Sequence, residues 1–206
     1  QATRVRMSED KTDNHSDSIT LQGREHHKDS MLRHGLLISE SVTPVLEEHI
    51  SKVCERLLIP RHSVTAFVYN RSDVQADCVI DSQESCVLRF TSGLINLMNE
   101  QEFQFVVAHE LAHFLFGHGA SSKNINEENL EDFMVKRAME LSADRIGFLG
   151  VDSLDDSIRA IMKIASGLGD EFLRFDVSSF MSQTEQLSNP SRGESRNNTN
   201  PSMLIR

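Results

Sequence analysis

Apolar and polar residues alternate in recognisable patterns along the middle of the chain. Between residues 41 and 60 the apolar side chains recur every three or four positions, which predicts an amphipathic helix. Three short segments at 64–69, 76–80 and 85–91 are rich in β-branched and aromatic residues, and the turn-forming DSQE separates the last two. We expect these three segments to form a small antiparallel sheet.

Helical spacing dominates the second half of the chain. The pattern predicts a short helix over residues 93–99 and a longer one over 100–116. After the polar stretch SSKNINEEN, helical spacing returns at 130–141 and 154–168, and a further short helix is predicted at about 176–187. With the sheet, these helices predict an α+β fold that is mainly helical.

Both ends of the chain are polar. Residues 1–30 lack periodicity and are expected to form a flexible polar tail, and the sequence from residue 188 onward is loop-like, rich in Ser, Asn, Arg and Pro. At 206 residues the chain is long enough for one domain with a substantial core. Residues 31–206 are therefore expected to form a single domain.

The charge of the chain restricts its partners and its location. A formal net charge of −10 argues against nucleic acid and anionic membrane surfaces, because both need a basic face.

No run approaches the roughly 18 apolar residues that span a bilayer. We expect a soluble cytoplasmic protein. Because the first residue is Gln1 rather than Met, a periplasmic protein, or one tethered through a missing N-terminal segment, is the alternative. The oligomeric state stays unknown.

The three cysteines give a weaker indication of compartment. Cys54, Cys78 and Cys86 form an odd set without CxxC spacing, which favours a reducing compartment and free, half-buried thiols. A disulfide between Cys78 and Cys86 across the predicted hairpin is the alternative.

The stretch VVAHELAHFLFGHGA, residues 106–120, places three titratable groups in the most apolar part of the chain. His109, Glu110 and His113 fit the pattern HExxH, and on a helix the i, i+4 spacing stacks both imidazoles on one face, where they can hold one metal ion. Burying these groups costs several kcal/mol unless each is paired. A divalent metal with its water would satisfy all three; core histidines bonded to neighbouring side chains are the structural alternative.

A catalytic zinc site needs a third protein ligand, and the next helix offers one. Glu140 and Asp144 lie at i, i+4 in the sequence ELSAD, so both face the same way. Glu140 would bind the metal, and Asp144 would accept the outer N–H of one histidine and fix its tautomer. A solvated acidic face is the alternative, but Leu141 and Ala143 interleave with the pair and make it less fitting.

These motifs resemble those of a known family. VVAHELAHFLFGH followed by MELSADRIG is similar to the HtpX-like family of gluzincin zinc metallopeptidases, which also includes the CAAX prenyl proteases and is marked by HExxH and then ExxxD. FTSGLINLMNEQEFQFVVAHELAH and LEEHISKVCERLLIPRHSVTAFVY resemble the segments that precede these motifs. The resemblance implies a zincin-like fold and one Zn²⁺ per chain bound by His109, His113 and Glu140. It further implies that Glu110 is the general base and that Asp144 orients a ligand.

The chain departs from the family near its C-terminus. The family carries Thr-His-Pro six residues before an arginine, and its His is thought to stabilise the oxyanion. The corresponding stretch is Thr199-Asn200-Pro201 with Arg206, so an asparagine replaces the histidine. Asn200 and Arg206 are therefore implied as oxyanion or substrate contacts. Because Asn200 can donate only a neutral hydrogen bond, we expect slower turnover.

The resemblance implies a zinc-dependent metalloendopeptidase whose substrates are proteins or peptides. In gluzincins the substrate is thought to lie along a sheet edge above the metal, and the resemblance suggests residues 85–91 as that edge. His118 falls outside the i, i+4 register and is interpreted as structural. Two alternatives stay open: a catalytically weak or zymogen-like member that binds peptides or proteins, and a zinc-stabilised structural module without turnover.

Overall fold

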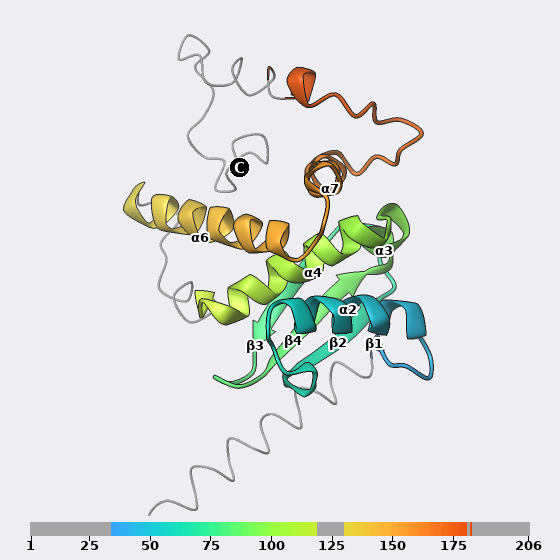
Figure 1. Cartoon of the computed structure of the whole chain (residues 1–206), viewed down its shortest axis with the longest axis vertical. Coiled ribbons are helices and arrows are strands. Elements are labelled where there is room, and N and C mark those ends of the chain that lie inside the picture. Colours follow the sequence, from blue (N-terminus) through green and yellow to red (C-terminus); the bar gives the residue numbers. More distant parts are fainter. Residues whose placement is uncertain (1–33, 119–129, 181, 183–206) are drawn as a thin grey trace, which may run out of the picture. The chain divides into compact units, whose positions relative to one another are not determined.

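The computed structural model describes residues 34–118, 130–180 and 182. The chain divides into two units after His34, and all described helices and strands belong to the unit Gly35–Arg206 (Figure 1). In chain order they are β1 (Gly35–Leu37), α2 (Pro44–Arg56), the short 3-10 helix η1 (Arg61–Ser63), β2 (Val64–Tyr69), β3 (Ala76–Ile80), β4 (Cys86–Thr91), α3 (Ser92–Leu97), α4 (Glu100–Leu115), α6 (Leu130–Leu149) and α7 (Leu154–Ser166).

Most predicted elements are confirmed, and so is the α+β class. β2 and β3 have their predicted bounds, while β4 begins one residue later and α4 ends one residue earlier than predicted. The strand β1 was not predicted, because three residues are too few to show a pattern. Of the helix predicted at 176–187, residues 177–180 are helical. The tail predicted at 1–30 and the loop from residue 188 lie outside the described residues.

The four described strands form a mixed sheet, not an antiparallel one. Their order is β1-β2-β4-β3, with β1 antiparallel to β2 and β3 antiparallel to β4, but β2 parallel to β4. The reason is the connection after β2, which skips one position in the sheet. The hairpin of β3 and β4 then folds back and inserts β4 beside β2 in the same direction.

This topology corrects the expectation that residues 85–91 form the sheet edge. β4 is an inner strand, because it pairs with β2 on one side and with β3 on the other. In the part of the chain that the structure describes, the outer strands are β1 and β3.

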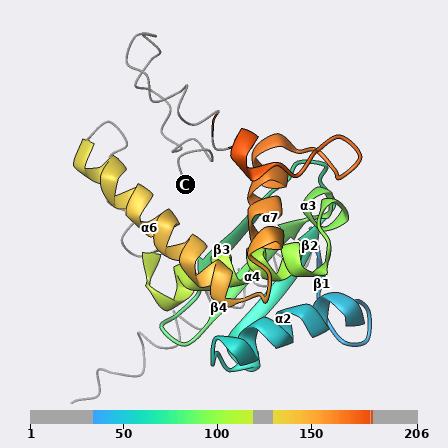
Figure 2. The ribbon, with the colours of Figure 1, turned by 45° about the horizontal axis from the view of Figure 1, so that its top comes forward.

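The main core lies between one face of the sheet and the helices α2 and α4. Buried apolar side chains from all three layers meet there, among them Ile50 and Val53 of α2, Leu88 and Phe90 of β4, and Val107 and Leu111 of α4. The helices α6 and α7 pack against α4 on the side that faces away from α2, as both views show (Figures 1 and 2). Helix α4 is thus covered from several sides.

Helix α4 is buried over most of its length, as its apolar sequence predicts. Every residue from Glu102 to Ala112 is buried. The helix begins with a capping box, in which the Asn99 side chain accepts from the Glu102 N–H at 2.9 Å and the Glu102 carboxylate accepts from the Asn99 N–H at 2.7 Å. These two hydrogen bonds fix the start of the helix that carries the HExxH motif.

Two glycines allow α6 to approach α4 closely. A Cβ atom at Gly147 would lie 2.6 Å from the Phe105 ring, and one at Gly150 would lie 2.2 Å from the Cβ of Ala108. The two helices run antiparallel, since Glu140 lies beside His113, whereas Asp144, one turn later in α6, lies beside His109, one turn earlier in α4. The approach therefore places Asp144 and Glu140 opposite the two HExxH histidines.

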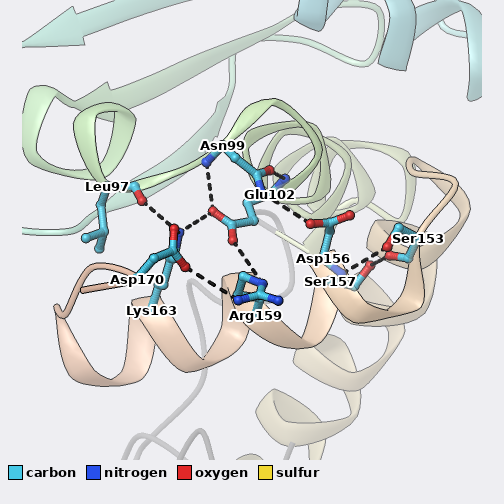
Figure 3. A network of polar contacts seen from close by, with 9 residues as sticks. All are labelled: Leu97, Asn99, Glu102, Ser153, Asp156, Ser157, Arg159, Lys163 and Asp170. Carbon is cyan, nitrogen blue, oxygen red and sulfur yellow. Dashed lines mark hydrogen bonds and ion pairs between the residues drawn. The ribbon is translucent and has the colours of Figure 1, made fainter. Parts of the chain in front are cut away.

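A buried ion pair joins α7 to the first turn of α4 (Figure 3). Lys163 Nζ donates to Glu102 Oε2 at 2.7 Å, to Asp170 Oδ2 at 2.8 Å and to the Leu97 carbonyl at 3.1 Å, which uses all three of its hydrogens. The side chains of Lys163 and Glu102 are 1% and 0% exposed. Burial lowers the pKa of Lys163, but the hydrogen bonds to Asp170 and Glu102 outweigh it and raise that pKa.

Across residues 34–118 and 130–180, no helix has both the length and the apolar content that a bilayer crossing requires.

We predict that Gly150→Ala destabilises the fold and weakens the site. The added methyl group overlaps Ala108 and pushes α6 away from α4, which should cost about 1–3 kcal/mol of unfolding free energy. Because Glu140 moves with α6, zinc affinity should fall as well. Urea denaturation and a zinc titration measure both effects. Gly169→Ala is the control, because its Cβ would have Leu97 Cδ1 as nearest neighbour at 3.8 Å. Equal effects of the two substitutions would contradict the prediction.

We also predict that Lys163→Met costs about 3–5 kcal/mol, because it removes the hydrogen-bonded cation of the buried Glu102 carboxylate and leaves only Arg159, at 3.9 Å, to balance its charge. Adding Glu102→Gln to this variant should restore much of the loss, since the buried negative charge is then gone. Lys52→Met is the matched control, because Lys52 pairs with Glu48 on the surface and such pairs contribute about 0–1 kcal/mol. Urea denaturation of the four proteins measures these differences, and a double variant no more stable than Lys163→Met would refute the charge explanation.

Candidate metal centre

The structure brings together the three ligands proposed from the sequence. His109 and His113 lie one turn apart on α4, and Glu140 reaches them from α6. Their ligand atoms all lie within 4.8 Å of one another, and the three form the one group of possible metal ligands found in the described residues. Glu140 is thus near the histidines, although 27 residues separate it from His113 in the chain.

The spacing of the donor atoms fits a zinc ion. The Nε2 atoms of His109 and His113 are 3.2 Å apart, and the Glu140 carboxylate lies 3.6 Å from the first and 3.7 Å from the second. In a tetrahedral zinc site with bonds of about 2.0–2.1 Å, ligand atoms lie about 3.3 Å apart. Two imidazoles and one carboxylate are also a donor set that catalytic zinc sites use. The residues present therefore fit the metal that the motif implies.

The three candidate ligands are partly exposed. The side chains of His109, His113 and Glu140 are 11%, 18% and 23% exposed, whereas the side chain of Asp144 behind them is 7% exposed. The three candidate ligands are therefore partly accessible, and more so than Asp144. An accessible position of this kind is what a catalytic site requires for water and substrate.

Asp144 orients the ring of His109. The carboxylate oxygen Oδ1 of Asp144 lies 2.9 Å from His109 Nδ1, on the side of the ring away from the other ligands. Burial lowers the pKa of His109, but hydrogen bonds to Asp144 and Glu140, with the charge of Glu110, outweigh it and raise that pKa to about 9. At neutral pH the metal-free ring therefore holds a proton that a metal ion must displace.

Glu110 lies on the buried part of α4, beside the ligands. Glu110 is 8% exposed. Its negative charge contributes to the raised pKa of His109 and to the raised pKa of Cys78. The largest cause of the Cys78 shift is its hydrogen bond to Cys86, followed by burial. Glu110 therefore acts electrostatically on a residue of α4 and on a residue of β3.

The three cysteines are free thiols, as the sequence analysis expected. Cys54 and Cys86 are buried and Cys78 is half-buried. Cys78 and Cys86 lie on the neighbouring strands β3 and β4, which confirms the predicted hairpin.

His118 contacts the centre, which the sequence analysis missed. Its Nδ1 lies 2.9 Å from Nδ1 of His113, and the two ring centroids are 5.0 Å apart at an interplanar angle of 68°. Burial lowers the pKa of His118, so the ring is neutral at pH 7. The signal for this contact was Gly117, which precedes His118 and has a φ of 63° that turns the chain back after α4.

Two proposed site residues are not placed by the structure. Asn200 and Arg206, implied by the resemblance as oxyanion or substrate contacts, lie outside the described residues. Their roles stay predictions.

Comparison with known proteins supports a peptidase. The model of peptidase family M48, a family of zinc metallopeptidases, matches residues 40–130, which run from the segment before α2 through the HExxH helix. No curated protein and no solved structure matches the chain significantly. The matched region ends before Glu140 and Asp144, so the third ligand and its neighbour rest on the geometry of α6. Residues 40–130 of the chain are thus similar to peptidase family M48.

Proposed function

We propose that the chain is a zinc-dependent endopeptidase of the HtpX-like gluzincin type. The observation that carries the proposal is the set of three donor side chains, His109, His113 and Glu140, at the spacing of a tetrahedral zinc site. The match to peptidase family M48 supports it independently, because that match covers the HExxH helix. One zinc ion per chain follows, because the part of the chain that the structure describes holds a single group of this kind.

In the proposed mechanism the residues of α4 and α6 have different roles. Zinc, when bound, supplies a Lewis acid that polarises the scissile carbonyl and acidifies a water molecule. Glu110 would act as general base: its carboxylate would accept a proton from the attacking water and then give that proton to the leaving amine. Asp144 holds the ring of His109 in the tautomer whose Nε2 lone pair faces the metal. The burial of Glu110 keeps competing water away from its carboxylate.

The strand β3 is the better candidate for the edge that binds substrate. It is an outer strand of the described sheet, it packs against α4, and the charge of Glu110 contributes to the raised pKa of its Cys78. An extended peptide that pairs with β3 would therefore run past the general base. Backbone pairing of this kind selects for an extended conformation more than for sequence.

The family match does not favour the weak, zymogen-like alternative, but Asn200 leaves the rate of turnover open. If Asn200 stands where the family has a histidine, Asn200→His should raise kcat with little change in KM, because the added positive charge acts on the developing oxyanion. Turnover unchanged by this substitution would separate Asn200 from the chemistry.

Metal binding is the first testable consequence. We predict that Glu140→Ala abolishes or severely weakens zinc binding, whereas Asp144→Asn weakens it about 10- to 100-fold, because Asp144 acts through His109. Competition against a chromophoric chelator measures both affinities. Glu131→Ala is the control, since Glu131 is an exposed carboxylate in the first turn of the same helix. Wild-type affinity in Glu140→Ala would remove Glu140 from the ligand set.

Proteolysis is the second consequence. We predict that Glu110→Gln keeps zinc but loses cleavage of an unfolded protein such as casein by at least about 10²-fold, since a carboxamide cannot accept the proton. Zinc content and cleavage are measured on the same samples. Zinc bound by two equally inactive proteins would instead support the structural module, and no zinc in the wild-type chain would overturn the proposed function.

A further inference from the structure

The geometry after the last turn of α4 gives His113 a partner of its own. The helix ends at Leu115, Phe116 caps it and Gly117 adopts a positive φ of 63°. In a continuous helix a residue five positions after His113 would lie about 140° around the axis. The turn at Gly117 instead brings the ring of His118 back to the ring of His113, with their Nδ1 atoms 2.9 Å apart.

The direction of this hydrogen bond follows from the proposed function. Nε2 of His113 faces Nε2 of His109 at 3.2 Å and the Glu140 carboxylate at 3.7 Å, so Nε2 is the atom that would bind zinc. A ligating nitrogen carries no proton, and the proton of a neutral His113 is then on Nδ1. His113 must donate, and Nδ1 of His118 must accept with a lone pair. The proton of His118 is consequently on its Nε2.

We propose that His118 is a positioning residue of the metal centre: its Nδ1 accepts the Nδ1–H of His113 and holds that ring with Nε2 aimed at the metal. The arrangement parallels that of His109, whose Nδ1–H donates to Asp144 at 2.9 Å. Each of the two histidine ligands thus has its outer nitrogen engaged, one by a carboxylate from α6 and the other by an imidazole from the turn after α4. The inference rests on the proposed function, because only a ligating His113 needs this tautomer.

A role in packing alone would predict a different outcome. The His118 ring also lies against Phe116, with centroids 5.4 Å apart at 32°. Phenylalanine at position 118 would keep a ring of similar size in contact with Phe116 and His113 but would lack the acceptor. Asparagine would lose the ring but place Oδ1 near the former position of Nδ1. The two substitutions therefore separate ring packing from hydrogen-bond acceptance.

The test measures the zinc dissociation constant of the full chain by chelator competition. His118→Phe should weaken zinc binding about 10- to 100-fold, and His118→Asn should restore most of the affinity. His62→Phe is the matched control, because His62 is exposed and lies in η1. The melting temperature of each metal-free protein shows whether its fold is intact.

A second readout detects the tautomers directly. In ¹⁵N–¹H spectra of the zinc-loaded wild-type protein, His113 should carry its proton on Nδ1 and His118 on Nε2. A proton on Nδ1 of His118, or His118→Phe with wild-type zinc affinity and an intact fold, would overturn the inference and leave the proposed function standing. A wild-type chain that binds no zinc would overturn both.

Discussion

The close approach of α6 to α4 is the constraint on which the metal centre depends. His109 and His113 come from α4 and Glu140 comes from α6, so the donor set exists only while the two helices touch. The contact has no room for a side chain at Gly147 or Gly150, which lie against Phe105 and Ala108. A helix pair usually packs about 8–10 Å apart, and glycines at the contact allow the lower end of that range. Glycine usually weakens a helix. At these two positions it is the reason that Glu140 can reach the histidines.

Burial of α4 carries a free-energy cost, because some of its buried side chains are ionisable, and the pairing of these side chains offsets that cost. Eleven consecutive residues from Glu102 to Ala112 are buried, and three of them are ionisable. Glu102 is paired with Lys163, and His109 with Asp144 and Glu140. The positive charge that the metal-free His109 holds, with its pKa raised to about 9, lies among carboxylates that would otherwise repel one another. A divalent ion at the same place satisfies the same carboxylates and both imidazoles, so proton and metal stabilise one arrangement by the same electrostatic means.

The sequence predicted the secondary-structure elements and the candidate metal ligands better than it predicted the strand order of the sheet. Period and composition located β2, β3 and α4 to within a residue, because these patterns are local. The i, i+4 pairs of HExxH and ELSAD predicted His109, His113, Glu140 and Asp144 together, since one helix face fixes the direction of both members of a pair. Strand order is not local, and the parallel insertion of β4 beside β2 left no mark in either strand. His118 was missed for a related reason, because counting helical register assumes that the helix continues through Gly117.

The two histidines of the candidate metal centre have hydrogen-bond partners of unequal strength, and the difference has a structural cause. Asp144 is a charged, buried acceptor on α6. Its hydrogen bond to His109 therefore links the candidate metal centre to the α4–α6 contact. His118 is a neutral acceptor on the turn that ends α4. Its hydrogen bond to His113 therefore joins two residues that are close in the sequence. Because a charged acceptor binds an N–H about twice as strongly as a neutral one, His109 is the more firmly fixed ligand. His113 and Glu140 are the more exposed members of the donor set. The centre is thus most rigid where the helices meet and most adjustable where the peptide would bind.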